Sequence, residues 1–167
     1  VGIVLASNTR MANGKEIFKV GITGSYGGLN LGDEAILQSI STQLRRDLPV
    51  EITVFSRDAE DTKRRHAIER AVPVRKLSRA EVTPEVERLD LLILGGGGIL
   101  YDADARTYLR EVAIAREKGV PVMVYAIGLE SEFFDGQRMI RTRPDRGLRK
   151  IADETGGGYF ELKRTTE

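Results

Sequence analysis

The sequence contains no cysteine, only one histidine and no long apolar run. Without cysteine there is no disulfide framework and no thiolate metal site, and such a chain fits a reducing cytoplasm, where we expect it to act. No apolar run approaches the ~20 residues that cross a bilayer, so we expect no membrane span. Histidine pairs and Asp-x-Asp-x-Asp loops are also missing, which argues against the common zinc and calcium sites.

An excess of charge of one sign is missing too. The formal net charge is +1, and Lys and Arg alternate with Asp and Glu along the chain. A nucleic-acid-binding chain would carry a clustered basic face, so we expect no nucleic-acid partner. The length of 167 residues and apolar content of 41% allow one globular domain with its own core. Because the first residue is Val, we expect a fragment or a processed product.

Glycine, by contrast, is abundant in two short segments. The first has five glycines over Gly21–Gly32 and joins an apolar strand pattern, Ile17–Ile22, to an amphipathic helix pattern, Glu34–Leu48. Glycine lets the backbone approach a ligand closely, and a loop that enters a helix N-terminus offers N–H groups to an anion. We therefore predict a phosphate or carboxylate site here, with Asn30 and Asp33 as hydrogen-bonding side chains beside the glycines.

The second glycine segment, Gly95–Gly98, follows the continuous apolar run Leu91–Leu94, which is typical of a strand covered on both faces. Four consecutive glycines cost backbone entropy on folding, so we expect them to allow a close approach of the backbone to a ligand. Two alternatives stay open: the glycines form only tight turns and close packing, or the loops bind a dinucleotide with Asp58 as the acid. We expect Asp102 to be a helix cap rather than a catalytic acid.

His66 is the only histidine, and it lies in the charged helical pattern Asp58–Arg70. We interpret it as a solvated surface residue, remote from both glycine segments. Serine-histidine-aspartate catalysis has little support, because the chain has no Gly-x-Ser-x-Gly elbow and His66 lies away from both glycine segments.

Strand and helix patterns alternate along the whole chain. Strands are predicted at Val1–Leu5, Ile17–Ile22, Val50–Phe55, Val72–Val74, Leu91–Leu94, Val120–Ile127 and Tyr159–Leu162, with an Asn13-Gly14 hairpin turn between the first two; helices are predicted at Glu34–Leu48, Asp58–Arg70, from Thr83, Ala105–Lys118 and Pro144–Thr155. This alternation predicts an α/β fold, a three-layer Rossmann-like sandwich with a mostly parallel central sheet. Ligands bind at the carboxyl ends of such strands, where both glycine segments lie.

Residues 24–37 (GSYGGLNLGDEAIL) and 90–102 (DLLILGGGGILYD), in this order and separation, resemble the two glycine loops of the polysaccharide pyruvyl transferase family. The resemblance covers about residues 19–128. It implies a two-lobed, Rossmann-like enzyme that transfers an enolpyruvyl unit from phosphoenolpyruvate to a sugar hydroxyl of a cell-envelope polysaccharide, with no cofactor and no metal. It assigns no catalytic residue. The predicted substrate-binding residues are Gly27, Gly28, Asn30, Gly32, Asp33, Gly95, Gly96, Gly97, Gly98 and Asp102.

The chain departs from the family after Gly128, where the family continues with Gly-Pro and a second lobe that carries basic and histidine residues. Here Leu129–Phe133 follows, and the tail Leu148–Phe160 resembles the last helix and strand of a von Willebrand factor A domain. We therefore expect one α/β domain: a hairpin extension (1–16), a transferase-like lobe (17–128) and a closing helix and strand (129–167).

Such a lobe is expected to be inactive alone. Its expected partners are a small anionic or sugar ligand and either a missing second lobe or another copy of the chain. The alternative is a von Willebrand A-like binding module without an intact metal site, since the Asp-x-Ser-x-Ser loop of that domain is missing.

Overall fold

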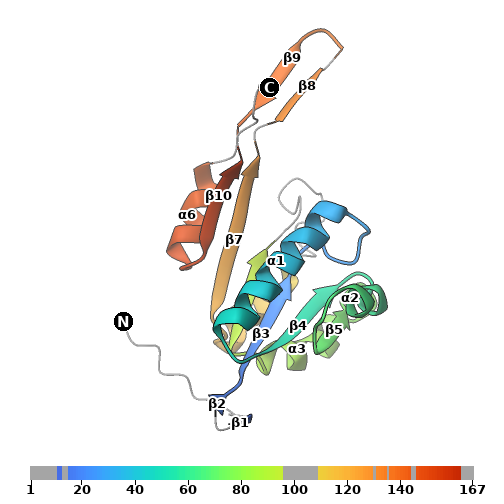
Figure 1. Ribbon diagram of the computed structural model, residues 1–167, viewed down its shortest axis with the longest axis vertical. Coiled ribbons are helices and arrows are strands. Elements are labelled where there is room, and N and C mark those ends of the chain that lie inside the picture. Colours follow the sequence, from blue (N-terminus) through green and yellow to red (C-terminus); the bar gives the residue numbers. More distant parts are fainter. Residues whose placement is uncertain are drawn as a thin grey trace. The chain divides into compact units, whose positions relative to one another are not determined.

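The computed structural model describes residues 11–12, 15–95, 109–129, 131–134, 136–143 and 146–162. Strands and helices alternate along this part of the chain (Figure 1). The strands are β1 (Met11–Ala12), β2 (Lys15–Glu16), β3 (Phe18–Thr23), β4 (Val50–Ser56), β5 (Arg70–Pro73), β6 (Leu91–Gly95), β7 (Val122–Leu129), β8 (Ser131–Phe134), β9 (Met139–Thr142) and β10 (Gly158–Leu162). The helices are α1 (Leu31–Asp47), α2 (Ala59–Arg65), α3 (Arg79–Glu87), α5 (Arg110–Lys118) and α6 (Arg146–Glu154). In the described ranges, no helix is long and apolar enough to cross a membrane.

Six of the strands form one sheet in the order β10-β7-β6-β3-β4-β5. The registered neighbours β10–β7, β6–β3, β3–β4 and β4–β5 are all parallel. At the centre, Val20 of β3 lies between Ile52 of β4 and Leu91 of β6. Pro73 lies on the edge strand β5, where the missing N–H of proline costs no ladder hydrogen bond. These observations confirm the predicted Rossmann-like α/β sandwich.

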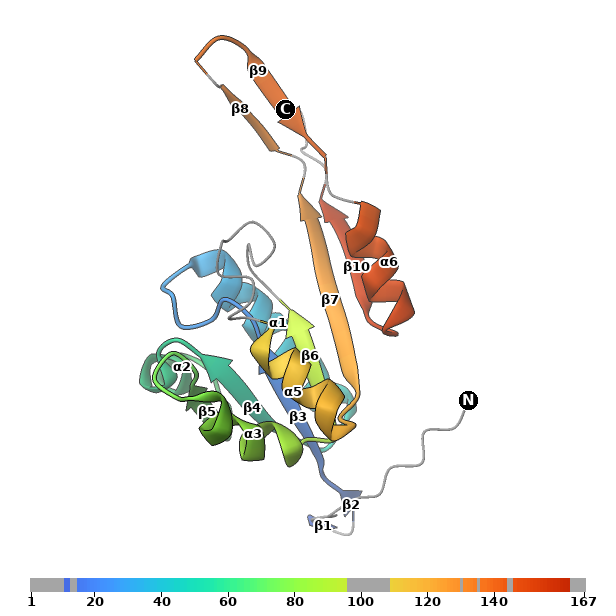
Figure 2. The ribbon, with the colours of Figure 1, turned by 180° about the vertical axis from the view of Figure 1, so that it is seen from behind.

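The chain divides into two compact units, Val1–Val122 and Met123–Glu167. In the first unit, α1 covers one face of β3 and β4, while α3 and α5 lie on the opposite face (Figures 1 and 2). Leu92 packs into an apolar cluster with side chains of α3 and α5, and both Leu92 and its neighbour Ile93 are buried. Because neighbouring residues of a strand point to opposite faces, β6 is covered on both sides. The prediction for Leu91–Leu94 is therefore confirmed.

The second unit contains β7, the β8–β9 hairpin, α6 and β10. Strand β10 runs parallel to β7, with Phe160 opposite Ile127, and the Arg149 guanidinium of α6 lies 4.7 Å from the centre of the Tyr159 ring. The helix and strand predicted for the tail are therefore confirmed. The antiparallel β8–β9 pair was not predicted, because four-residue strands are too short to show a clear alternation.

Three predicted element boundaries are wrong. The hairpin strands around Asn13-Gly14 are β1 and β2, and β3 pairs in parallel with β4 and β6 instead of returning from the turn; Val1–Leu5 lies outside the described residues. Helix α3 begins after Ser78, where a capping box with Glu81 supplies the first-turn hydrogen bonds, so the proline at 84 lies inside the helix. Helix α2 ends at Arg65, and β5 already begins at Arg70.

Candidate functional site

The two glycine segments start side by side at the carboxyl edge of the sheet. Strands β3 and β6 are adjacent and parallel, and Thr23 at the end of β3 lies opposite Leu94. A Cβ at Gly24 would overlap the carbonyl oxygen of Gly95, so only glycine allows these two backbone segments to approach this closely. The predicted convergence of the loops is confirmed for their first residues. Gly96, Gly97, Gly98 and Asp102 lie outside the described residues.

Tyr26 links the first glycine loop to the end of β6. Its side chain is fully buried, and the phenol donates a hydrogen bond of 2.5 Å to the carbonyl oxygen of Gly95. Burial raises the pKa of the Tyr26 phenol far above its usual value, and the nearby carboxylates of Asp33 and Glu34 raise it further. At neutral and acidic pH the phenol therefore stays protonated and remains a hydrogen-bond donor.

Gly27 turns the loop back over the end of β4. Its φ of 70° is in the left-handed region, and a Cβ there would overlap the Ser56 hydroxyl and lie 2.6 Å from the backbone nitrogen of Asp58. The backbone N–H of Arg57 donates to the carbonyl oxygen of Tyr26 at 3.0 Å. The glycine is thus required twice, by its backbone conformation and by the packing of the loop on the β4–α2 connection.

The predicted residues Asn30, Gly32 and Asp33 form the start of α1. Asn30 is the N-cap, and its side-chain oxygen accepts the Gly32 N–H at 2.9 Å. Asp33 is buried in the first turn, and this burial raises the pKa of its carboxyl, while a hydrogen bond with Ser25 and the charge of Arg57 act in the opposite direction. Asn30 and Gly32 are exposed.

Arg57 is a cation at this loop that sequence reasoning missed. A Cβ at the exposed Gly28 would lie 3.6 Å from the Arg57 guanidinium, and the charge of Arg57 also acts on Asp33. A signal was available, because Arg57 directly follows β4, whose carboxyl end lies at the same edge as that of β3. Asp58, considered above as a dinucleotide-binding acid, instead caps α2 by accepting the Asp61 N–H at 3.0 Å.

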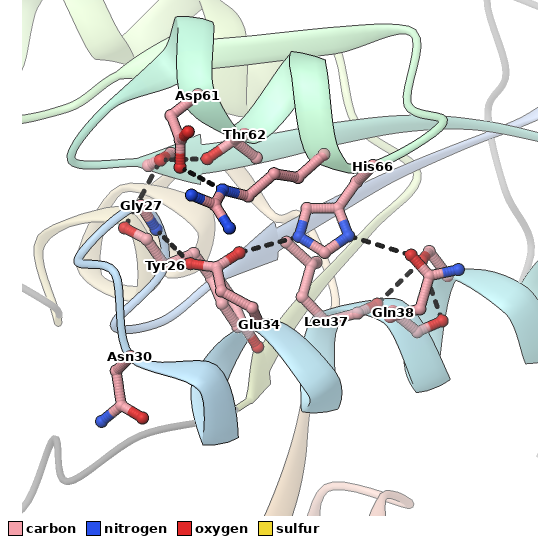
Figure 3. Close-up of polar contacts among 12 residues, drawn as sticks. Tyr26, Gly27, Asn30, Glu34, Leu37, Gln38, Asp61, Thr62 and His66 are labelled. Carbon is pink, nitrogen blue, oxygen red and sulfur yellow. Dashed lines mark hydrogen bonds and ion pairs between the residues drawn. The ribbon is translucent and has the colours of Figure 1, made fainter.

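His66 was predicted to be exposed and remote from the loops, and this prediction is wrong. The side chain is buried, with only 6% of the residue exposed, and it lies against α1 (Figure 3). Its Nε2 is 2.7 Å from Oε2 of Glu34, and its Nδ1 is 3.0 Å from Oε1 of Gln38. The other oxygen of Glu34, Oε1, accepts the Gly27 N–H at 2.9 Å. The single histidine is therefore connected to the first glycine loop through one carboxylate.

The reason for this error lies in the end of α2. Helix α2 stops at Arg65, and His66 takes an extended conformation as its C-cap, which directs the chain toward α1. The charged residues that suggested a solvated helix are Lys63, Arg64 and Arg65, which are exposed on α2. The sequence pattern suggested that the helix continues through residue 66, which would place His66 among these exposed side chains.

A second buried carboxylate, Glu111 on α5, lies beneath the end of β3. The Thr23 hydroxyl donates to Oε2 of Glu111 at 3.5 Å, and the Arg110 guanidinium pairs with Oε1 at 2.8 Å. Arg110 also donates to the carbonyl oxygens of Val74 and Leu77, at 2.9 Å each. Burial raises the pKa of Glu111, and Arg110 opposes this shift. The Arg110–Glu111 ion pair fixes the first turn of α5 under the site. The sequence did not indicate this pair.

The site therefore combines backbone N–H groups, two buried acids on α1 and one arginine at the carboxyl edge of β3 and β6. Within the residues that the structure describes, no three histidine or acidic side chains are grouped closely enough to hold a metal ion. Two leucines, Leu29 and Leu31, are largely exposed on either side of Asn30, and Leu29 has a φ of 62° that leucine rarely adopts.

Comparison with known proteins gives one family. The family model described as "Polysaccharide pyruvyl transferase" matches residues 30–144, which is more than half of the chain. The match begins at Asn30, the N-cap of α1, and includes the whole second glycine segment. No curated protein matches the chain. The chain belongs to the polysaccharide pyruvyl transferase family.

Proposed function

We propose that this chain forms the glycine-loop lobe with which a pyruvyl transferase binds phosphoenolpyruvate. In the reaction, two hydroxyls of a sugar add to C2 of phosphoenolpyruvate, C3 gains a proton and phosphate leaves with the other proton, so that a pyruvate ketal remains on the sugar. The acceptor is a sugar of a cell-envelope polysaccharide, and the absence of cysteine favours the cytoplasm as the place of the reaction.

The observation that carries this proposal is the hydrogen bond from Tyr26 to Gly95, which joins the two glycine segments at one edge of the sheet. Open parallel sheets bind their ligands at this edge. The dianionic phosphate and the carboxylate of phosphoenolpyruvate need several N–H donors and a cation, and the loop offers the exposed backbone around Gly28 with Arg57 beside it.

We expect the chain by itself to bind phosphoenolpyruvate weakly and to transfer little or no pyruvyl group. The transfer needs an acid–base group and cations around the departing phosphate. At the first loop, Asp33 and Glu34 are carboxylates that repel an anion, and His66 is already engaged by Glu34 and Gln38. A second lobe would supply the missing groups, and a half-open site corresponds to a Kd of about 1 mM or weaker.

The test is an NMR titration of the ¹⁵N-labelled chain with phosphoenolpyruvate, with pyruvate and inorganic phosphate as comparison ligands. We expect the amide signals of Gly27–Asp33 to move with a millimolar Kd, and Arg57→Gln to weaken binding at least about tenfold. Arg46→Gln is the matched control, because Arg46 is an exposed arginine at the far end of α1, paired with Asp47. If these loop signals do not respond to phosphoenolpyruvate, the proposed binding site is wrong. Rapid phosphate release by the chain alone would contradict the expected inactivity.

A further inference from the structure

His66 lies between two side-chain oxygens, one at each ring nitrogen. Oε2 of Glu34 faces Nε2, and Oε1 of Gln38 faces Nδ1. In this orientation, Nε2 of the Gln38 amide donates to the Thr42 hydroxyl at 3.1 Å. A neutral imidazole has one N–H and can donate to only one of the two oxygens, whereas the imidazolium donates to both.

The other charged groups around His66 already have partners. Glu34 is the acid that faces the ring from α1, and its side chain is 9% exposed. On α2, Asp61 pairs with Arg64 and Arg65. In the segment after the histidine, Glu69 pairs with Arg45 of α1, and the Arg45 guanidinium also donates to the Ala67 carbonyl oxygen. Asp33, the neighbouring buried acid on α1, interacts electrostatically with Glu34, so the local charge balance involves His66, Glu34 and Asp33.

We propose that Glu34 and His66 are positioning residues for the first glycine loop. The imidazolium of His66 holds one oxygen of Glu34, and the other oxygen holds the Gly27 N–H, so that the loop conformation depends on the protonation of His66. Deprotonation replaces a buried ion pair with a weaker contact and leaves a nitrogen lone pair facing an oxygen, which loosens Glu34 and with it Gly27. Only the consequence for ligand binding rests on the proposed function; the coupling within the chain stands without it.

The first test follows the ligand-free chain by NMR between about pH 5 and pH 8.5. We expect the Gly27 amide signal to follow the titration of the His66 ring and to lose its protection from hydrogen exchange as the ring becomes neutral. The proposal is wrong if the Gly27 signal is unaffected while the His66 ring titrates.

Glu34→Gln is the conservative variant that separates positioning from packing. Its side-chain oxygen can still accept the Gly27 N–H, and its NH₂ can donate to Nε2 of a neutral His66, whose Nδ1–H then donates to Gln38. We expect Glu34→Gln to keep the loop in place at all pH values and to remove the pH dependence of the Gly27 signal. Glu34→Ala should expose Gly27 to exchange at every pH. If Glu34→Gln retains the wild-type pH dependence, the proposal is overturned, even where Glu34→Ala fails to fold.

The second test uses phosphoenolpyruvate as the probe. Its phosphate also titrates, near pH 6, and the wild-type chain and Glu34→Gln share this effect, so their difference isolates the contribution of the protein. We expect wild-type affinity to fall about tenfold relative to Glu34→Gln as the pH rises from 5.5 to 8.5. Parallel pH profiles for the two chains would refute the positioning role. No binding by either chain, with the Gly27 coupling intact, would instead refute the proposed function alone.

Discussion

Replacing Tyr26 with Phe removes one hydroxyl and almost nothing else. The phenylalanine ring fills the same fully buried space, so no large cavity forms, and only the 2.5 Å hydrogen bond to the Gly95 carbonyl is lost. Loss of a buried donor leaves its acceptor without this partner, which costs about 1–3 kcal/mol. For a chain of this length, each kcal/mol corresponds to a fall in Tm of about 2–4 °C. We therefore expect Tyr26→Phe to lower the Tm by about 2–12 °C.

Urea unfolding and calorimetry of the whole chain measure this effect. Tyr159→Phe is the matched control, because the Tyr159 hydroxyl makes only a long contact of 3.4 Å with the exposed Glu161, and we expect a change below about 0.5 kcal/mol. A Tyr26→Phe chain as stable as Tyr159→Phe would show that the phenol does not join the two loops. Tyr26→Ala adds a cavity, and we expect it to cost about 3–5 kcal/mol.

The pH dependence of the same variant provides an independent check. Because burial raises the pKa of Tyr26 in the folded chain, the unfolded chain loses this proton first, at about pH 10. The folded state then binds more protons than the unfolded state, so the contribution of Tyr26 is complete below pH 10 and declines above it. The stability difference between wild type and Tyr26→Phe should shrink by about 1.4 kcal/mol per pH unit above pH 10. A difference that stays constant to pH 11.5 would refute the assigned burial of the phenol.

Three further predictions concern the same loop. Gly27→Ala should cost at least about 2 kcal/mol in urea unfolding, because it combines a positive φ with overlap on Ser56, whereas Gly119→Ala, with the same φ but open space, should cost only about 1 kcal/mol; equal costs would contradict the packing argument. Leu29→Gly should stabilise the chain by up to about 1 kcal/mol by relieving a left-handed leucine, and a destabilised variant would mean that this exposed side chain makes contacts. Asp33→Asn should raise the Tm at pH 7, because burial raises the pKa of Asp33 and its ionised form therefore destabilises the folded chain. The gain should vanish below about pH 4, where the carboxyl is protonated in the unfolded chain as well. A gain independent of pH would be inconsistent with this cause.

The sheet could be predicted from the sequence because its strands carry unambiguous patterns. Leu91–Leu94 is continuously apolar since β6 is covered on both faces, and the predicted strand Val72–Val74 overlaps the edge strand β5, where its proline interrupts no ladder. The carboxyl edge then followed from topology alone, because parallel strands end on the same side. The starts of both glycine segments could thus be placed at one edge of the sheet from the sequence.

The polar connections within the site could not be predicted, because they depend on where helices stop and turn. The path from Gly27 through Glu34 to His66 requires that α2 end at Arg65, and helix ends are poorly defined by hydrophobic spacing. The contact from Tyr26 to Gly95 joins residues 69 positions apart, and no local pattern indicates such a pair. Arg57 and Glu111 were missed for a related reason, since isolated charged residues resemble solvated ones until their neighbours are known.

The strand order also determines when the site can form during folding. Strands β3, β4 and β5 are neighbours both along the chain and in the sheet, so this half of the sheet needs only local crossovers. Strand β6 must instead return to the free side of β3, and there the Lys19 N–H meets the Asp90 carboxylate, 71 residues later, at 2.8 Å. Closure of so long a loop costs entropy before its contacts form, which makes it a slow step. The acceptor for Tyr26 is carried by β6, so the final anchor of the glycine loop depends on this long-range closure.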